Sequence, residues 1–261
     1  ILGISDEDYP ELPKINDCDE IICNQSILKS MIDQTLFAIS TNDTKPVHTG
    51  SLFEIEENIL TLVSVDGYRL AIRKEHLKLS KNVSFIVPGK TLQELSKLMM
   101  DTQEEMKISA GGRHIIFDIN GYSVISRLIE GDFLDYKSAL PNVTTTTIKI
   151  STKECIDSID RTALLISDKT KSPLKIEFSQ DLMKLSCTTA IGKAYDEISC
   201  EMDGEEVDMG FNNKYLLDAL RHSQCDKIKL EINGPLSPMK IVPLEGDSFL
   251  FLVLPVRLKN E

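Results

Sequence analysis

Two nine-residue segments, Ile32-Asp-Gln-Thr-Leu-Phe-Ala-Ile-Ser40 and Ile159-Asp-Arg-Thr-Ala-Leu-Leu-Ile-Ser167, decide the fold of this chain. They lie 127 residues apart and share Ile, Asp, Thr, Ile and Ser at the same places. Each lies in a stretch with apolar residues at helical spacing, which predicts amphipathic helices over residues 25–40 and 153–167. A match of this kind indicates a tandem repeat of one structural unit.

The predicted elements around the two segments follow the same order in both halves. Val87-Pro-Gly-Lys90 and Gly210-Phe-Asn-Asn-Lys214 each lead into a further predicted helix, residues 91–100 and 215–222. Turn dipeptides such as Asn120-Gly121 separate period-two apolar runs, which predicts hairpins of antiparallel strands. The strands are expected at residues 18–23, 51–55, 59–64, 69–73, 84–87, 106–109, 114–119, 122–128, 147–150, 174–178, 183–188, 194–200, 227–232 and 239–242. The chain is therefore predicted to be an α+β protein made of two similar units.

The head of the chain fits the same scheme. Residues 7–13 resemble the connector at residues 132–141. Residues 1–16 are therefore expected to be the end of a further copy of the unit.

Composition excludes several classes of protein. The formal net charge of −12 over 261 residues argues against a surface that binds nucleic acid everywhere, but it leaves room for a local basic surface. No apolar run approaches the roughly 18 residues of a membrane span, and the first residues lack the pattern of a signal peptide. The six cysteines form no C-x-x-C pair, so zinc and disulfide frameworks are unsupported and reduced, cytoplasmic thiols are expected. No metal or organic cofactor is implied.

The last apolar stretch, Phe249-Leu-Phe-Leu-Val-Leu-Pro255-Val-Arg-Leu258, combines two patterns. Its aromatic and branched residues predict a buried strand over residues 249–253. Pro255 cannot donate to a central ladder, so the strand is expected to end before it. The apolar residues past the strand, Leu254 and Val256 among them, are either packed locally or presented to a partner.

Four features together resemble one protein family. They are the repeat, Val65-Asp-Gly-Tyr-Arg-Leu-Ala71, Gly210-Phe-Asn-Asn-Lys-Tyr215 and Leu254-Pro-Val-Arg-Leu258. In this order and spacing they resemble the bacterial DNA polymerase III β subunit, the sliding clamp. The resemblance covers essentially the whole chain.

This resemblance implies a fold and a function. Each domain would hold two β-α-β-β-β halves, with helices facing a central channel and antiparallel sheets outside. Residues 1–16 would end a mostly missing first clamp domain, residues 17–141 would form the second and residues 142–261 the third. Such a clamp is a processivity factor that closes into a ring as a head-to-tail homodimer and encircles duplex DNA, with weak contacts to a few channel cations. Those cations would be Lys29, Lys45, Lys90, Arg161, Lys214 and Arg221.

The resemblance also implies a partner site. In this family a hydrophobic cleft between the second and third domains receives short apolar motifs. These motifs belong to the replicative polymerase alpha subunit, the clamp-loader delta subunit, other polymerases and repair proteins. An apolar pocket suits aromatic and Leu anchors, while Asn and backbone groups orient the peptide. Matched position by position, the cleft would be lined by Val65, Gly67, Tyr68, Arg69, Leu70, Leu134, Ser138, Ala139, Asn212, Tyr215, Leu236, Pro238, Leu252, Leu254, Pro255, Val256 and Arg257.

Two other functions compete with a clamp. An enzyme is not expected, because the acids Asp66, Glu130, Asp132 and Asp135 show no catalytic spacing. The chain also contains no P-loop, G-x-G-x-x-G, G-x-S-x-G or H-E-x-x-H motif. A non-enzymatic peptide-binding scaffold that does not encircle DNA stays open as the alternative.

Overall fold

The computed structural model of the chain describes residues 15, 18–42, 44–77, 82–167 and 172–258. The expected end of a preceding copy, residues 1–16, lies outside the described residues apart from Ile15. In chain order the helices and strands are β1 (Asp19–Asn24), α1 (Gln25–Thr35), β2 (Gly50–Glu56), β3 (Ile59–Val65), β4 (Arg69–His76), β5 (Val83–Pro88), α2 (Gly89–Leu98), β6 (Glu105–Gly111), β7 (His114–Ile119), β8 (Tyr122–Arg127), β9 (Thr146–Ser151), α3 (Thr152–Thr162), β10 (Leu174–Ser179), β11 (Leu182–Thr189), β12 (Gly192–Ser199), β13 (Glu201–Gly204), β14 (Val207–Phe211), α4 (Asn213–His222), β15 (Lys227–Ile232), β16 (Met239–Pro243) and β17 (Phe249–Val253).

Both copies of the repeat contain the β-α-β-β-β order twice. In the first copy the strands lie side by side as β5-β2-β3-β4 and as β1-β6-β7-β8. In the second copy the corresponding orders are β14-β10-β11-β12 and β9-β15-β16-β17. Every strand pairing is antiparallel. The predicted α+β fold of tandem units is therefore confirmed.

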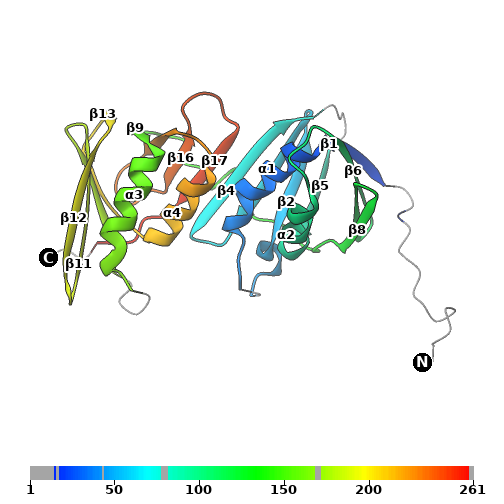
Figure 1. Ribbon diagram of the computed structural model, residues 1–261, viewed down its shortest axis with the longest axis horizontal. Helices are drawn as coiled ribbons and strands as arrows, with labels where there is room; N and C mark the ends of the chain where they lie inside the picture. The colour runs from blue at the N-terminus through cyan, green and yellow to red at the C-terminus, as the bar shows by residue number, and fades with distance from the viewer. Residues whose placement is uncertain (1–14, 16–17, 43, 78–81, 168–171, 259–261) are drawn as a thin grey trace.

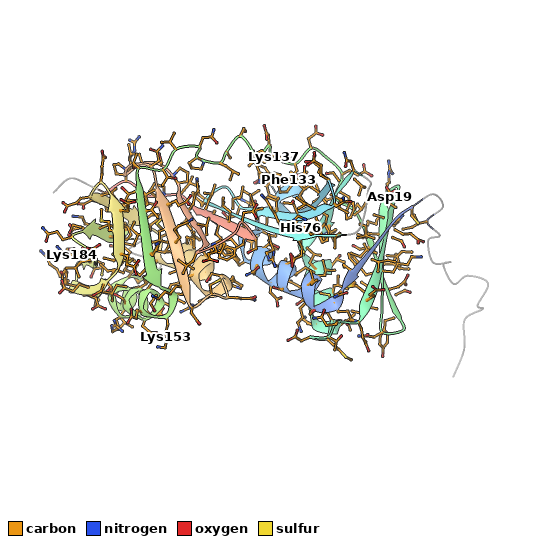
Figure 2. The ribbon with its side chains drawn as sticks, turned by 90° about the horizontal axis from the view of Figure 1, so that it is seen from above. Asp19, His76, Phe133, Lys137, Lys153 and Lys184 are labelled. Atoms are coloured by element: carbon orange, nitrogen blue, oxygen red, sulfur yellow. The ribbon has the colours of Figure 1, made fainter. Side chains whose placement is uncertain are left out.

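In the part of the chain that the structure describes, helices α1 to α4 all lie on one side of the molecule (Figures 1 and 2). Each helix buries one face against the sheets, as with Leu28, Met31 and Ile32 of α1 and Ile159 of α3. Each copy has its own core, formed by these helix faces and the inward residues of its strands. The helical periodicity in the sequence therefore marks the face turned to the core, and the opposite face is available to solvent.

The two repeated segments end their helices earlier than the sequence predicts. Residues 25–40 and 153–167 were expected to be continuous helices, but α1 ends at Thr35 and α3 at Thr162, and a 3-10 turn follows each. The matched threonines explain this. The hydroxyl of Thr35 donates to the carbonyl of Met31 (2.8 Å) and that of Thr162 to the carbonyl of Ser158 (2.9 Å). Such back-bonding from Thr to the fourth preceding carbonyl bends and weakens a helix, so the repeat encodes the helix end as well as the helix.

The sequence prediction omitted two strands, β13 and β14. This stretch is rich in acids, which are depleted in strands, and β13 is the outer strand of its sheet. Pairing with β9 and β10 respectively gives these residues their extended form. Tertiary context therefore overrides local propensity here.

The two copies share one continuous sheet. Strand β17 of the second copy pairs with β4 of the first, from Phe249 opposite Arg73 to Val253 opposite Arg69. The result is a nine-stranded sheet, β13-β9-β15-β16-β17-β4-β3-β2-β5. The buried strand predicted at residues 249–253 is confirmed, and it forms the joint between the copies.

The connector between the copies crosses the molecule on the side opposite the helices. Figure 2 places its residues Phe133 and Lys137 on that side and Lys153 of α3 on the other. Tyr136 is buried there in a third, smaller core with Val63, Ile72 and Leu252. None of the helices in the described ranges is both long enough and apolar enough to cross a membrane.

Candidate peptide-binding cleft and channel face

The β3–β4 turn is fixed by one carboxylate. Asp66 Oδ1 accepts hydrogen bonds from the backbone N–H of Tyr68 (2.9 Å) and of Arg69 (3.0 Å), and its Oδ2 accepts from Arg69 Nε (2.9 Å). Gly67 has φ +93°, a conformation that favours glycine. The turn therefore holds Tyr68 outward, where its side chain is exposed at 60%.

Arg69 ties this turn to the second copy of the repeat. Its guanidinium donates to the carboxylate of Asp218 on α4 as well as to Asp66. Its central carbon lies 4.7 Å from the ring centroid of Tyr215 and 5.5 Å from that of Phe37. Two carboxylates and two aromatic rings thus immobilise one long side chain at the joint.

Tyr68 and Tyr215 form an aromatic pair across the joint. Their ring centroids are 5.8 Å apart and the rings are nearly parallel, at 20°. Tyr215 is positioned by the start of α4, where the Asn212 side chain caps the helix by accepting from the N–H of Lys214 (3.0 Å). The pair places two phenol rings, one from each copy, on the same surface.

The C-terminal stretch passes beside this pair. Its backbone is held by hydrogen bonds from the N–H of Leu254 to the carbonyl of Tyr68 (2.9 Å) and from the N–H of Val256 to the carbonyl of Gly210 (2.8 Å). A Cβ at position 210 would lie 2.7 Å from the Val256 carbonyl oxygen, so the close approach requires glycine. The side chains of Leu254 and Val256 are nevertheless 39% and 40% exposed. The backbone of this apolar tail is therefore packed locally, whereas its side chains are exposed enough to contact a partner.

Buried apolar residues form the layer under this surface. Val65, Leu70 and Leu252 belong to the small core that also holds Tyr136 of the connector. The Tyr136 hydroxyl donates to Glu54 Oε2, and Lys137 Nζ lies 3.1 Å from the same oxygen. Burial, and then the hydrogen bond to Glu54, raise the pKa of Tyr136. The connector is thus anchored on the outer face of the sheet beside the turn.

The helix side carries cations that are largely engaged by acids. Arg161 of α3 donates to Asp196 Oδ2 of β12 from Nε (3.0 Å) and from Nη2 (2.6 Å). Partial burial works against ionisation of Asp196, but hydrogen bonding, including that of Arg161, outweighs it and lowers the pKa of this carboxyl. Arg221 of α4 donates to both oxygens of Asp160 (3.0 and 2.8 Å).

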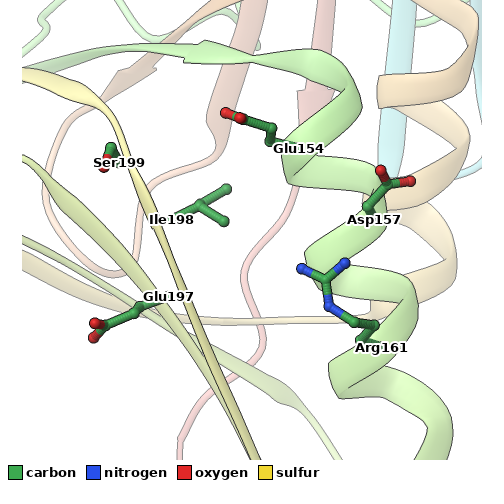
Figure 3. Close-up of a pocket in the computed structure, with 6 residues that line it drawn as sticks. All are labelled: Glu154, Asp157, Arg161, Glu197, Ile198 and Ser199. Carbon is green, nitrogen blue, oxygen red and sulfur yellow. The ribbon is translucent and has the colours of Figure 1, made fainter.

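Arg161 also lines a pocket between α3 and β12. The other lining residues are Glu154, Asp157, Glu197, Ile198 and Ser199. Figure 3 shows Glu154, Asp157 and Arg161 projecting from the helix and Ile198 pointing toward it from the strand. The described residues contain no cluster of three or more His, Cys, Asp or Glu that could hold a metal ion.

Three of the remaining predicted channel cations, Lys29, Lys90 and Lys214, belong to helices on the same side. Lys29 Nζ donates to the carbonyl of Met99 (3.1 Å), which holds it against the end of α2. Lys45, Lys90 and Lys214 are exposed, in the loop after α1 and in the first turns of α2 and α4. The structure therefore brings basic groups to the helix side, but pairs the two arginines with carboxylates.

Comparison with known proteins covers the chain from end to end. The family "DNA polymerase III beta subunit, central domain" matches residues 22–135, and "DNA polymerase III beta subunit, C-terminal domain" matches residues 137–257. The chain belongs to the DNA polymerase III beta subunit family.

Individual relatives agree with this assignment. The beta sliding clamp of Staphylococcus aureus is 34% identical over 258 residues, covering 98% of this chain and 68% of the relative. The DNA polymerase sliding clamp of Bacillus subtilis superposes with a TM-score of 0.95 at 32% identity, covering 98% of this chain and 69% of that one. A Pseudomonas aeruginosa sliding clamp bound to griselimycin has a TM-score of 0.93 at 26% identity, covering 98% and 70%.

The positions matched to the clamp family fall into three groups in the structure. Three of them, Val65, Leu70 and Leu252, are buried beneath the surface. Those that are half-buried are Arg69, Asn212, Tyr215, Pro238 and Pro255, and those that are exposed are Gly67, Tyr68, Leu134, Ser138, Ala139, Leu236, Leu254, Val256 and Arg257.

The hydrogen bonds and contacts bring most of these residues together around the joint. Leu134 follows Phe133, which packs on the small core, and Ala139 donates from its N–H to the carbonyl of Tyr136 (3.1 Å). Leu236 and Pro238 lie in the β15–β16 loop, beside Met239, whose ladder partner is Val253. No contact recorded in the described part of the chain links Leu236 or Arg257 directly to the turn.

Sequence reasoning missed the residues that hold this site in place. They include Phe37, Asp218 and His48; Phe37 lies within the first repeated segment but is not one of its matched residues. His48 is buried against the ring of Phe133 (5.8 Å), and burial, followed by the nearby Lys45, lowers its pKa. Asp218 could have been found, because it lies three residues after Tyr215 on the same helix and so on the same face.

Proposed function

We infer that this chain acts as a sliding clamp, a processivity factor that keeps DNA polymerase on its template. The observation that carries this function is the match to the beta subunit family over both copies of the repeat. A peptide-binding scaffold that never encircles DNA is not favoured, because the relatives are sliding clamps. The chain is proposed to have no catalytic activity of its own, since a clamp acts by enclosure. Because its proposed role is on DNA and its relatives are bacterial sliding clamps, the cytoplasm is its proposed location.

Duplex DNA is proposed to run past the helix side. The cations proposed to meet its phosphates are Lys29, Lys45, Lys90, Arg161, Lys214 and Arg221. Because Arg161 and Arg221 are paired with carboxylates, few counterions would be released on binding, so the affinity would be weak and would fall only gently as the salt concentration rises. Weak contact suits a protein that must move along DNA while enclosing it.

The partner cleft is proposed at the joint between the copies, with the seventeen positions matched to the family as its lining. What supports it is the surface of exposed apolar side chains there, Tyr68, Leu134, Leu254 and Val256, above a buried apolar layer. A surface of this kind receives apolar anchors of a peptide. Its proposed partners are the replicative polymerase alpha subunit, the clamp-loader delta subunit, and other polymerases and repair proteins with short apolar motifs.

A head-to-tail homodimer, proposed for the full-length protein, is supported by the pattern of the internal joint. In the repeat, β8 takes the place of β17 and β12 takes the place of β4, the two strands that form the joint. Within the described part of the chain, β8 and β12 are the outer strands of their sheets (Figure 1). An outer strand offers an unpaired edge to another strand. The two ends of the molecule therefore carry opposite halves of the same kind of joint.

Exposed apolar residues gather at both of these ends. Leu164, Ile191 and Tyr195 lie at or next to β12, and Leu98, Met100 and Tyr122 lie at or next to β8 and α2. Unlike ends that attract one another give a head-to-tail interface, which closes into a ring when the rotation permits. We expect light scattering to find dimers of the full-length protein, and Tyr195→Lys to shift them toward monomers. A full-length protein that stays monomeric at all concentrations would contradict this assembly.

The domain boundaries also stay a proposal. The second domain is placed at residues 17–141 and the third at residues 142–261, with residues 1–16 as the end of a first domain. Support comes from the connector, because β8 ends at Arg127 and β9 begins at Thr146. The split at residue 141 falls within that segment.

The experiment that tests the cleft is fluorescence anisotropy with a labelled peptide of the Gln-Leu-x-Leu-Phe type. Leu254→Ala with Val256→Ala removes two of its apolar walls, and we expect the affinity to fall by roughly tenfold or more, because each truncated anchor costs about 1 kcal/mol. The matched control is Leu244→Ala, an apolar residue that is equally exposed but lies at the far end of β17. The same loss of affinity in the control, or wild-type affinity in the double variant, would overturn the assignment of the cleft.

A further inference from the structure

Phe37 lies outside the proposed cleft, in the 3-10 turn after α1, yet it connects the cleft to α4. Its ring stacks on His222 of α4, with centroids 4.8 Å apart and an interplanar angle of 20°. It meets the ring of Phe251 edge-on at 5.3 Å. On the remaining side the guanidinium of Arg69 lies over it. Phe37 is therefore the one described residue that contacts α4, β17 and the cleft turn through its ring.

Arg69 needs more than its carboxylates to be held in place. Asp66 and Asp218 accept from its N–H groups and so direct the edge of the guanidinium. The rings of Phe37 and Tyr215 lie against the guanidinium carbon and limit its sideways movement. With a side chain only 12% exposed, Arg69 has little water to replace a lost contact. Removing the Phe37 ring would let it shift away from Tyr215.

Tyr215 carries that shift to the cleft surface. Its ring contacts Arg69 and pairs with Tyr68. A change in Arg69 therefore changes the backing of the Tyr68–Tyr215 pair, although neither tyrosine touches Phe37 through any recorded contact in the described ranges. Because partner binding depends on pre-organised anchors, a looser pair binds less tightly.

We propose that Phe37 is a positioning residue for partner binding, which holds the Tyr68–Tyr215 pair in its binding geometry through Arg69. This inference rests on the proposed cleft and adds a residue that is not among the positions matched to the family. A merely structural role for Phe37 in the joint is the competing explanation. The chain offers a matched control for it in Phe249, whose ring also packs on Phe251 (4.8 Å) but is not recorded in contact with Arg69.

The test measures the affinity of the full chain for the labelled Gln-Leu-x-Leu-Phe peptide, together with the thermal midpoint of each variant. Phe37→Leu keeps the apolar volume and removes the ring, and we expect about fivefold weaker binding, the size of one partly desolvated cation–π contact. Phe37→Tyr retains the ring and is expected to restore the affinity. Phe249→Leu is expected to lower the thermal midpoint like Phe37→Leu but to bind like the wild type.

A double-variant comparison separates positioning from packing. In an Arg69→Met background, Phe37→Leu is expected to cause no further loss of affinity. The guanidinium of Arg69, which connects Phe37 with Tyr215, is already absent from that background. Should Phe37→Leu fail to fold, Phe37→Met takes its place, since it also lacks a ring and fills the gap.

Three results would overturn the proposal. They are wild-type affinity in Phe37→Leu, an equal loss in Phe249→Leu, and an additive loss in the Arg69→Met background. Absence of binding by the wild-type chain is a different failure, because it removes the proposed cleft itself and the positioning role with it.

Discussion

Strands β4 and β12 hold the same place in the two copies of the repeat, but their surroundings differ. Each follows a hairpin whose strands are joined by a two-residue turn of positive φ, Glu57-Asn58 between β2 and β3 and Gln180-Asp181 between β10 and β11. Counting along the ladders from these turns, Ile72 of β4 corresponds to Tyr195 of β12. Ile72 is 2% exposed and Tyr195 is 62% exposed. The same position of the repeat is therefore part of the core in the first copy and exposed on the surface in the second.

The difference shows what creates the surface where the cleft is proposed. Strand β3 and the first half of β4 are buried on both faces, whereas β11 and β12 alternate between more and less exposed residues. Two further elements cover the β3–β4 hairpin. Strand β17 pairs with its edge, and the connector with Tyr136 packs on its outer face. The repeat unit alone therefore forms an ordinary half-exposed sheet, and the proposed partner site lies where two units and their connector meet.

The strongest way to test this comparison is to place the same residue at both positions. Ile72→Thr puts a hydroxyl into a buried apolar site and removes apolar volume, so we expect a loss of about 2–3 kcal/mol in the free energy of unfolding. Tyr195→Thr replaces an exposed side chain by a good strand former, and the change is expected to stay within about 0.5 kcal/mol. Urea unfolding of each variant as a monomer measures both values.

Equal losses at the two positions would break the comparison, because they would show that β12 is covered in solution. If the loss at Tyr195 appeared only at high protein concentration, the cover would be another copy of the chain. That outcome would sharpen the comparison, since it would make β12 the open counterpart of the β4 joint.

The sequence predicts the repeat well and the joint poorly, for a physical reason. Helical spacing and turn dipeptides are local, so the helices and most strands could be placed from the residues alone. The pairing of β17 with β4, by contrast, depends on contacts between residues about 180 positions apart in the sequence. The final strand was predicted to be buried, but nothing in its sequence indicates which strand it pairs with.

The same limit applies to the site. Tyr68, Arg69 and Leu254 could be placed in the cleft because they belong to recognisable segments. Phe37 and Glu54 could not, because their role comes only from the side chains they meet after folding. Arg161 and Arg221 were predicted as channel cations from their charge and the resemblance to the family, and neither reveals the acids beside them.

A smaller effect on stability is expected from a substitution in the connector, the second of the two elements that pack on the β3–β4 hairpin. Tyr136→Phe keeps the buried ring but removes the donor to Glu54, which leaves this carboxylate with Lys137 as its recorded partner. We expect a loss of about 1 kcal/mol in the free energy of unfolding near neutral pH. Tyr122→Phe, which alters an exposed tyrosine of β8, is the matched control and should have little effect.

The pH dependence of this variant gives an independent reading of the connector. Burial and the hydrogen bond to Glu54 raise the pKa of Tyr136 above its ordinary value of 10.0, so the folded chain keeps a proton that the unfolded chain releases. The stability that depends on this proton is therefore complete below about pH 10 and is lost as the pH rises above it. Between pH 9 and pH 10.5 the wild type should lose stability more steeply than Tyr136→Phe, and Tyr122→Phe should follow the wild type. Parallel curves for all three would mean that Tyr136 is solvated in solution, and the connector would then no longer distinguish the β4 side of the molecule from the β12 side.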